Sequence, residues 1–378
     1  MANTLHHASP RLEEGAALDA FAEPAVRTRI IVIGGGQAGL SVGYHLRRLG
    51  VTDFLILDAE ARIGDAWRKR WDSLQLFTPA AFDGLDGMAF PAPRDATPGK
   101  DEMADYLEAY ARHFELPVVL KARVTHLGRD GGRFAVTAGG RQYEAARVIV
   151  AMSNYQVPKR PGFAAALSPE IVQLDLGSYR NPGQLRPGAA LVVGAANSGA
   201  EIANDLVPTH RVLLAGRRVS EVPGKYSSPV NRRVVVPLLN RLVFPHILSV
   251  NTPIGRKARP KVIKSAAPLI RVKSRDLAAM GVVRVGRITG VRDGKPLCDD
   301  GSVCEVANVI WCTGFDNGLG WIDLPVLQDD GEPDHERGVA RGVDGLYFVG
   351  QHFLTSMASA MVFGVNRDAR RIAKLAAG

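Results

Sequence analysis

The feature that most constrains this chain is an apolar run that ends in three spaced glycines. Residues 30–33 are all aliphatic, which predicts a buried parallel strand, and residues 38–49 have the pattern of a helix. Between them lie Gly34, Gly36 and Gly39. The first allows a tight strand-to-helix turn, the second lets the backbone approach a pyrophosphate, and the third lets helix and strand pack closely. The helix N-terminus would offer its free N–H groups to the phosphates.

An acidic residue completes this first unit. Residues 53–57 follow as a second strand, which ends at Asp58. A carboxylate at that place suits a hydrogen bond to the ribose of an adenosine. Strand, glycines, helix and acid together predict a dinucleotide site, and a glycine turn in an ordinary α/β unit is the alternative.

The pattern occurs a second time along the chain. Residues 189–193 are expected to form a strand, followed by Gly194, Ala196 and Gly199 and then by a helix. Alanine in the middle position is small enough to keep the phosphate-binding turn. An accidental second glycine turn is the alternative.

The second unit differs from the first at the end of its next strand. Residues 212–215 are followed by Arg217 and Arg218 and by no acid. An acid repels a 2′-phosphate on the ribose, whereas an arginine pairs with it. The two units are therefore expected to hold two different dinucleotides, the second one phosphorylated.

Size and composition limit which other classes of protein this chain can belong to. A chain of 378 residues has room for two domains, and no apolar run reaches the roughly 18 residues that span a membrane. The N-terminus lacks the pattern of a secretory signal, and Cys298, Cys304 and Cys312 form no Cys-x-x-Cys pair, which fits a reducing cytoplasm. The histidines show no metal-ligand spacing, so no metal site is expected.

Positive charge is concentrated in one segment. Residues 222–275 hold twelve Lys and Arg and no Asp or Glu, which exceeds the net charge of +9 of the whole chain. A solvated basic face is the simplest interpretation. The alternatives are attraction of an anionic cofactor or substrate, and loose docking on an anionic membrane. Nucleic acid is not expected, because the segment lacks stacking aromatics and a known binding motif.

The stretch 63–79 carries a resemblance to a known family. Gly64, followed by Trp67 and Arg68, directly after the adenosine-binding unit, resembles the segment that wraps the isoalloxazine ring in flavin-containing monooxygenases. These include the plant indole-pyruvate (YUCCA) type and its bacterial relatives, which usually have Gly-Gly-x-Trp there. An aromatic ring and an arginine can cover a planar flavin and balance its reduced, anionic form. Alternatively, Trp67 and Trp71 are core residues.

Further motifs extend the resemblance from residue 30 to the C-terminus. Residues 194–199 are similar to the family's Gly-x-Gly/Ala-Asn-Ser-Gly. Thr313 and Gly314 resemble its Ala-Thr-Gly strand end, where the chain crosses back to the first domain. This chain departs from the family at Ser153, which stands for a glycine, and at Asp175, which aligns with a histidine.

The resemblance implies an α/β fold with two nested Rossmann-like dinucleotide-binding domains, in which an NADPH-binding domain interrupts an FAD-binding domain. We expect a mobile N-terminal extension over residues 1–27, the FAD domain over 28–160 and 302–378, and the NADPH domain over 161–301. The expected FAD contacts are Gly34, Gly36, Gln37, Ala38, Gly39, Asp58, Ala59, Trp67, Arg68, Val124 and Gly350. The expected contacts at the second unit and the crossing point are Gly194, Ala196, Asn197, Ser198, Gly199, Glu201, Arg217, Arg218, Thr313 and Gly314.

The activity that this family implies is an NADPH-dependent monooxygenation. NADPH would reduce FAD, and O₂ would form a flavin C4a-hydroperoxide that transfers one oxygen atom to a small organic substrate. Gln75 and Thr78 are the candidate polar groups that face the flavin. Two alternatives stay open: an FAD-dependent NADPH oxidase or reductase that passes electrons to oxygen or another acceptor, and a binding protein without catalysis. The sequence also leaves a homodimer open.

Overall fold

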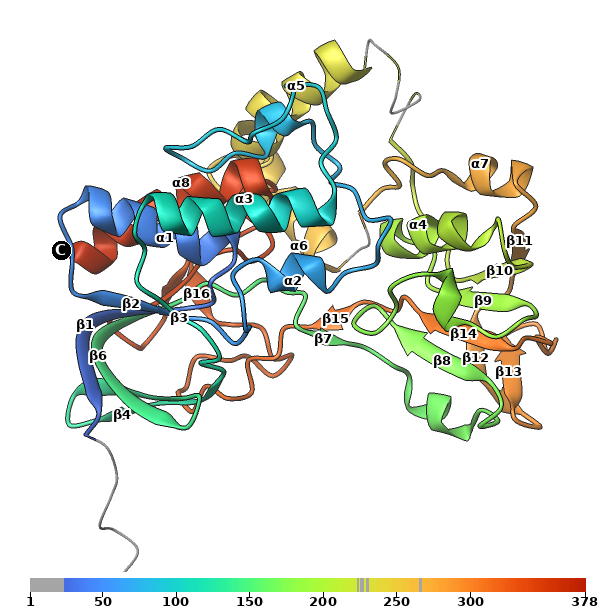
Figure 1. Ribbon diagram of the computed structural model, residues 1–378, viewed down its shortest axis with the longest axis horizontal. Helices are drawn as coiled ribbons and strands as arrows, with labels where there is room; N and C mark the ends of the chain where they lie inside the picture. Colours follow the sequence, from blue (N-terminus) through green and yellow to red (C-terminus); the bar gives the residue numbers. More distant parts are fainter. Residues whose placement is uncertain (1–23, 223, 225–227, 229–230, 265–266) are drawn as a thin grey trace, which may run out of the picture.

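Two α/β bodies stand side by side in the computed structural model, which describes residues 24–222, 224, 228, 231–264 and 267–378 (Figure 1). Each body is built on a sheet whose central strands are parallel. These strands are short aliphatic runs, as expected of sheets that are covered on both faces. The predicted α/β class with two Rossmann-like units is confirmed.

The first sheet is centred on the strand that precedes the first glycine turn. β1 pairs in parallel with β2 on one side and with β6 on the other, and β18 continues this order beyond β6. β4 and β5 form an antiparallel hairpin that joins β6. The strands are β1 (Val26–Ile33), β2 (Phe54–Leu57), β3 (Val118–Val119), β4 (Val124–Asp130), β5 (Arg133–Ala138), β6 (Arg141–Val150), β16 (His335–Glu336), β17 (Val339–Ala340) and β18 (Leu346–Phe348).

Three helices cover one face of this sheet, as Figure 1 shows: α1 (Gln37–Arg48), α3 (Lys100–His113) and α8 (Val362–Ala377). Their apolar side chains recur at helical spacing and form the larger core with the sheet. Ser41 of α1 also donates a hydrogen bond to Asn366 of α8 at 2.8 Å, which ties the two helices together inside the core. The hairpin β4–β5 encloses a second core on the opposite face.

The second sheet repeats the arrangement on a smaller scale. Its order is β11-β10-β9-β14-β8, all parallel. The helices α4 (Asn197–Leu206) and α7 (Ser274–Ala279) lie on the same side of it (Figure 1). Its strands, with the attached hairpin β12–β13, are β8 (Val172–Asp175), β9 (Ala190–Val193), β10 (Val212–Ala215), β11 (Val283–Val285), β14 (Asn308–Trp311), β12 (Ile288–Arg292) and β13 (Lys295–Cys298).

Short segments connect the two bodies. β7 (Val157–Pro158) leaves the first body and pairs antiparallel with β15 (Phe315–Asp316), on which the chain returns. The helices α2 (Asp65–Arg68), α5 (Val236–Leu238) and α6 (Pro253–Lys264) lie outside the two layered units (Figure 1). No helix in the described part of the chain combines the length and hydropathy needed to cross a bilayer.

The N-terminal boundary differs from the expected one. Residues 1–23 of the expected extension lie outside the described residues. Val26 and Arg27, which we placed in the extension, already belong to β1, because they pair with Tyr143 and Glu144 of β6.

The return to the first domain also differs from the expected residue 302. β14 lies between β9 and β8 of the second sheet, and Val309 and Ile310 are 0% exposed because both faces of this strand are covered. We therefore propose that the NADPH-binding domain extends through β14 and that the return is made on β15.

Candidate functional site

The first glycine turn has the geometry of a phosphate cradle. Gly34 has a φ of +108°, and a Cβ there would lie 2.9 Å from the carbonyl oxygen of Ala151. A Cβ on Gly39 would lie 1.8 Å from the carbonyl oxygen of Gly34, so helix and strand touch at backbone level. At Gly36, by contrast, a Cβ would meet nothing within 4 Å, and no side chain caps the N-terminus of α1. The turn thus presents uncapped backbone N–H groups to open space, which fits a pyrophosphate.

The second turn reproduces this geometry. A Cβ on Gly199 would lie 1.8 Å from the carbonyl oxygen of Gly194, and Gly194 itself has a φ of +117°. Ala196 has φ −81° and ψ −174°, against −78° and −171° at Gly36, and α4 also lacks a capping side chain. The alanine therefore leaves the backbone of the cradle unchanged, because this position needs no left-handed conformation.

Backbone hydrogen bonds align the strand ends of the two units. The N–H of Gly34 donates to the carbonyl of Leu57 at 2.8 Å, and the N–H of Gly194 donates to that of Ala215 at 2.9 Å. The residue after each acceptor is Asp58 in the first unit and Gly216 in the second. The position of Asp58 is therefore taken by a glycine in the second unit, and Arg217 and Arg218 follow it directly.

Asp58 ties the end of β2 to the first glycine turn. Its Oδ2 accepts from the N–H of Gly35 at 2.5 Å, and its Oδ1 accepts from the N–H of Glu60 at 2.7 Å. Burial raises the pKa of Asp58 above its usual value, and the two backbone donors oppose that shift. The remaining lone pairs of this half-buried carboxylate are free for a ribose hydroxyl.

Arginines surround the end of β10 instead. Arg217 and Arg218 are exposed, and none of the described residues forms an ion pair with either. Arg284 of β11 donates to the carbonyl of Gly216 at 2.7 Å; burial lowers the pKa of Arg284, and the positive charge of Arg218 lowers it further. Sequence reasoning missed Arg284, because only strand pairing brings β11 beside β10. Three cations without a carboxylate suit a phosphate monoester.

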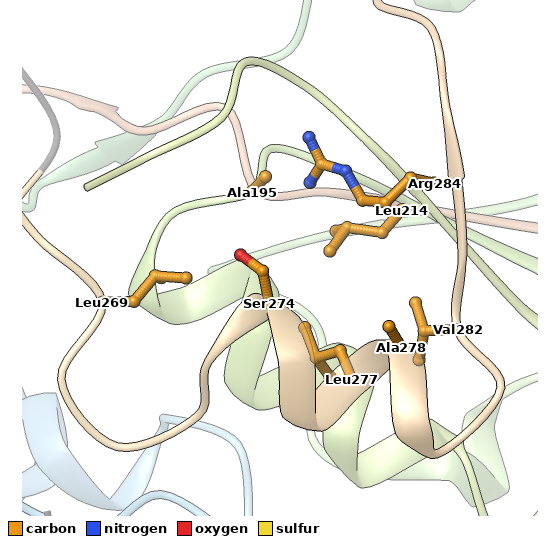
Figure 2. A pocket seen from close by; sticks show the side chains of 8 residues that line it. All are labelled: Ala195, Leu214, Leu269, Ser274, Leu277, Ala278, Val282 and Arg284. Carbon is orange, nitrogen blue, oxygen red and sulfur yellow. The ribbon is translucent and has the colours of Figure 1, made fainter. Parts of the chain in front are cut away.

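A pocket opens beneath the second turn. Figure 2 shows the guanidinium of Arg284 pointing back toward Ala195 of the turn, with Leu214 of β10 and Leu277 of α7 below it. Ser274 supplies the other polar group of a lining that is otherwise aliphatic. Arg284 therefore borders both the second cradle and this small, mainly apolar pocket.

The segment from Trp67 to Trp71, which we call the strap, connects the two bodies. Trp67 packs against the core of the first body, and its Nε1 donates to Gln37 of α1 at 3.4 Å. Trp71 is buried in the core of the second body. The N–H of Asp72 donates to the carbonyl of Arg180 at 2.7 Å. Trp71 is thus a core residue of the second body, whereas Trp67 is partly buried against the core of the first body.

Arg68 is engaged by carboxylates of the first body. Its guanidinium binds Asp105 at 2.7 Å and Glu108 at 3.2 Å on α3, and Asp65 at 3.3 Å. These carboxylates hold the largely buried side chain against α3, and its contact with a flavin stays a prediction. Their contacts occupy the charge that was predicted to balance a reduced flavin.

Arg70, two residues later, lies at the junction instead. Its guanidinium lies 5.3 Å from the centre of the Phe315 ring on β15, and burial lowers the pKa of Arg70. Tyr155 packs edge-on against Phe315 at 5.5 Å and against His352 at 5.2 Å. The Tyr155 side chain is 46% exposed, and burial raises the pKa of its phenol. No sequence motif marked this cluster.

Several predicted contacts are engaged within the protein. Arg271 binds the carboxylate of Glu201 and donates to Oε1 of Gln75, which extends the connection between the bodies. Asn197 donates to the carbonyl of Pro268 at 2.9 Å and accepts from the N–H of Ile270 at 3.0 Å. These side chains therefore hold the loop that follows α6 and leave the backbone of the cradle for a ligand.

Thr78 lies in the loop that follows the strap. Its hydroxyl donates to Asp83, which is 0% exposed and whose Oδ2 has no hydrogen-bond partner. Burial raises the pKa of Asp83 to about 7, and the bond from Thr78 opposes that rise. That Gln75 and Thr78 face a flavin stays a prediction.

The remaining predicted contacts lie around the two turns. A Cβ on Gly350 would lie 2.8 Å from Cβ of Ala38, so the strand end reaches the start of α1. The N–H of Ala122, just before Val124, donates to the carbonyl of Asp58 at 2.7 Å. Thr313 donates to the carbonyl of Lys159, which fixes the crossing segment. Three further contacts are exposed or half-buried at the turns: Ala59, Ser198 and Gly314.

The cysteines form neither a disulfide nor a metal site in the described chain. Cys298 and Cys304 are buried with their sulfurs 3.5 Å apart, and burial raises the pKa of the Cys304 thiol to about 12. No group of three His, Cys, Asp or Glu among the described residues could hold a metal ion.

Comparisons with known proteins agree with this geometry. The family model described as pyridine nucleotide-disulphide oxidoreductase matches residues 31–240. An uncharacterized CzcO-like oxidoreductase of Geobacillus kaustophilus is 38% identical over 90% of this chain and 95% of its own length. The probable indole-3-pyruvate monooxygenase YUCCA1 of Arabidopsis thaliana is 29% identical over 85% of this chain and 84% of its own length.

A solved structure gives the same result. The flavin-containing monooxygenase of Stenotrophomonas maltophilia superposes with a TM-score of 0.69 at 27% identity, over 93% of this chain and 98% of that one. The resemblance predicted from residues 63–79 and from the two turns is thereby confirmed. The chain belongs to the pyridine nucleotide-disulphide oxidoreductase family and, within it, to the flavin-containing monooxygenases.

Proposed function

We propose that the protein is an NADPH-dependent FAD monooxygenase that transfers one atom of O₂ to a small organic substrate. The observation that carries this proposal is the pair of equivalent turns with opposite charge at their strand ends. The first, with Asp58, suits the unphosphorylated ribose of FAD, and the second, with Arg217 and Arg218, suits the 2′-phosphate of NADPH.

The protein's own contribution is to bind, orient and exclude water. The N-termini of α1 and α4 would hold the two pyrophosphates. The strap from Trp67 to Trp71 keeps the two sites in one frame, since each tryptophan packs with a different core. Bound FAD supplies the redox and oxygen chemistry, and Arg70 and Tyr155 would line the place where substrate enters.

The preference for NADPH over NADH tests whether the second turn is the NADPH site. A guanidinium–phosphate contact is worth roughly 1.5–3 kcal/mol, so Arg217→Ala with Arg218→Ala should lower kcat/KM for NADPH by roughly 10- to 100-fold. The loss should fall on NADPH, because NADH has no 2′-phosphate. Arg211→Ala, at the opposite end of β10, is the matched control and should keep the wild-type ratio.

The measurement is kcat/KM for both coenzymes at constant ionic strength. If the double variant keeps the wild-type NADPH-to-NADH ratio, both arginines are ordinary surface charges. The second turn would then not be the NADPH site proposed here.

A further inference from the structure

The segment between β10 and α7 has an exposed surface that the dinucleotide chemistry does not use. From Asn231 to Ile247 the chain is continuously helical, with π-helical stretches on both sides of α5. α6 begins shortly afterwards at Pro253. In Figure 1 the yellow run around α5 stands at the upper edge of the molecule, whereas α6 lies lower, at the level of the helices of the first body.

Large apolar side chains are concentrated on this surface. Five of the twelve that are exposed in the described chain lie between residues 234 and 254. Val234, Leu238 and Leu242 are 59%, 51% and 48% exposed. Their spacing of four falls between the α-helical turn and the wider π-helical turn, so the three side chains share one face. Ile247 and Ile254 extend the apolar surface toward α6.

The opposite side of the same helical run packs on the protein. Asn240 is buried, and the guanidinium of Arg241 lies 5.5 Å from the centre of the Phe82 ring. Arg367 of α8 donates to the carbonyl of Pro245 at 2.7 Å. The run is therefore held in place by one face while its apolar face points to solvent.

The charged residues that accompany the apolar ones are all basic. Those with exposed side chains include Arg233, Arg256, Lys257 and Lys261. The sequence 222–275 contains no acid that could neutralise them. An anionic lipid surface satisfies both features at once, because its headgroups attract the cations and its acyl region accepts the apolar stripe. Nucleic acid would leave the stripe in water.

We propose that this surface docks the protein on an anionic membrane. The docking face is coupled to the body that holds the first cradle. Ser249 donates to the carbonyl of Thr355 at 3.0 Å, and the N–H of Met357 donates to the carbonyl of Leu248 at 2.9 Å, just before α8 begins. Docking would therefore fix the orientation of the whole first body toward the bilayer.

Vesicle co-sedimentation of the full-length protein tests the proposal. We expect binding to vesicles that contain about 30% phosphatidylglycerol in phosphatidylcholine at low salt, no binding to pure phosphatidylcholine, and release at about 0.5 M NaCl. Each cation near such a surface contributes roughly a 5-fold change in affinity, so Lys257→Gln with Lys261→Gln should weaken binding by roughly 10- to 30-fold. Leu238→Asn with Leu242→Asn should weaken it at least as much.

Two control double variants remove apolar or basic side chains at other places on the protein surface. Leu49→Asn with Leu375→Asn removes apolar residues of similar exposure, and Arg211→Gln with Arg287→Gln removes two exposed cations. Both should bind vesicles as the wild type does, and circular dichroism should show that all four variants are folded.

Three results would overturn the proposal. The first is no sedimentation of the wild type with anionic vesicles at low salt, and the second is equal binding to neutral vesicles. The third is a wild-type dimer that Leu238→Asn with Leu242→Asn converts to a monomer without any vesicle binding, which would assign the stripe to contact between two chains. Each readout is independent of which coenzyme the enzyme uses.

Discussion

At the scale of single residues, the two glycines nearest the start of α1 have different neighbours. A Cβ on Gly36 would meet open space, whereas a Cβ on Gly39 would collide with the carbonyl oxygen of Gly34 at 1.8 Å. Gly36→Val should therefore fold, because its φ of −78° suits any residue, yet lose FAD, because the branched side chain occupies the phosphate position. Gly39→Ala should fail to fold.

The flavin content of the purified proteins checks this pair. The wild type should be yellow and release FAD on denaturation, and Gly36→Val should be colourless with a circular dichroism spectrum like that of the wild type. Gly36→Ala is the matched control and should retain FAD, since Ala196 occupies the equivalent place in the second turn. Stoichiometric FAD in Gly36→Val would place the pyrophosphate elsewhere.

Asp83 predicts a pH dependence of stability. Burial raises its pKa to about 7, whereas the carboxyl of the unfolded chain titrates near the ordinary aspartate pKa of about 3.9. Between about pH 4 and pH 7 the folded state keeps a proton that the unfolded state has released, so the free energy of unfolding falls as pH rises, by at most about 4 kcal/mol. Asp83→Asn removes this loss and should raise Tm at pH 8 but hardly at pH 4.

Asp86→Asn provides a control, because the carboxylate of Asp86 should affect stability with the opposite pH dependence. The bond from His45 lowers the pKa of Asp86, and Arg370 lowers it further. This carboxylate therefore stabilises the fold above its unfolded pKa, and Asp86→Asn should lower Tm at neutral pH. A Tm difference between Asp83→Asn and the wild type that does not change from pH 4 to pH 8 would show that Asp83 is not protonated in the folded protein.

The sequence indicated which small residues the two turns need. It did not indicate which polar side chains are free to bind a ligand. Gly34, Gly39 and Gly199 follow from a local motif, because their role depends on neighbours close in the chain. Arg68 and Arg70 look alike in sequence. Only tertiary contacts with α3 and β15 show that the first is neutralised by carboxylates and the second lies at the junction.

At the scale of elements, the connection between α4 and the loop that follows α6 can be tested through the buried ion pair of Glu201 and Arg271. The side chains of Glu201 and Arg271 are 7% and 18% exposed. Arg271→Met would leave a buried carboxylate unpaired and should destabilise the protein by about 3 kcal/mol. Adding Glu201→Leu should restore most of that loss, because an apolar pair of similar volume needs no partner.

Chemical denaturation of the single and double variants measures this effect. Lys295→Met is the matched control: its pair with Glu305 is exposed, so the loss should stay below about 1 kcal/mol. Equal effects of Arg271→Met and Lys295→Met would show that the buried pair contributes no more to stability than an exposed one.

The repeated strand–turn–helix units could be predicted because aliphatic runs and glycines are local signals. The place of β14 could not, since a buried strand has the same pattern in either sheet and only its pairing with β9 and β8 decides. The parallel pairing of β3 with β2 could not be predicted either, because its two valines carry no information on strand direction.

At the scale of the whole molecule, two sheets of equivalent design face a common junction, and β7 and β15 cross it side by side. The proposal places one nucleotide site in each body, so electrons would have to pass between the bodies. The substrate side of that junction, with Arg70 and Tyr155, is where this chain's specificity is expected to lie.

The central claim is that these two sites support oxygen transfer and not mere oxidation of NADPH. The most direct measurement is the incorporation of label from ¹⁸O₂ per NADPH consumed, with a thioether, an amine and indole-pyruvate as substrates. We predict that at least one substrate gains a single ¹⁸O atom, with about one product formed per NADPH. NADPH consumption that yields only peroxide or another reduced acceptor, with no ¹⁸O in any of the organic products, would contradict the account.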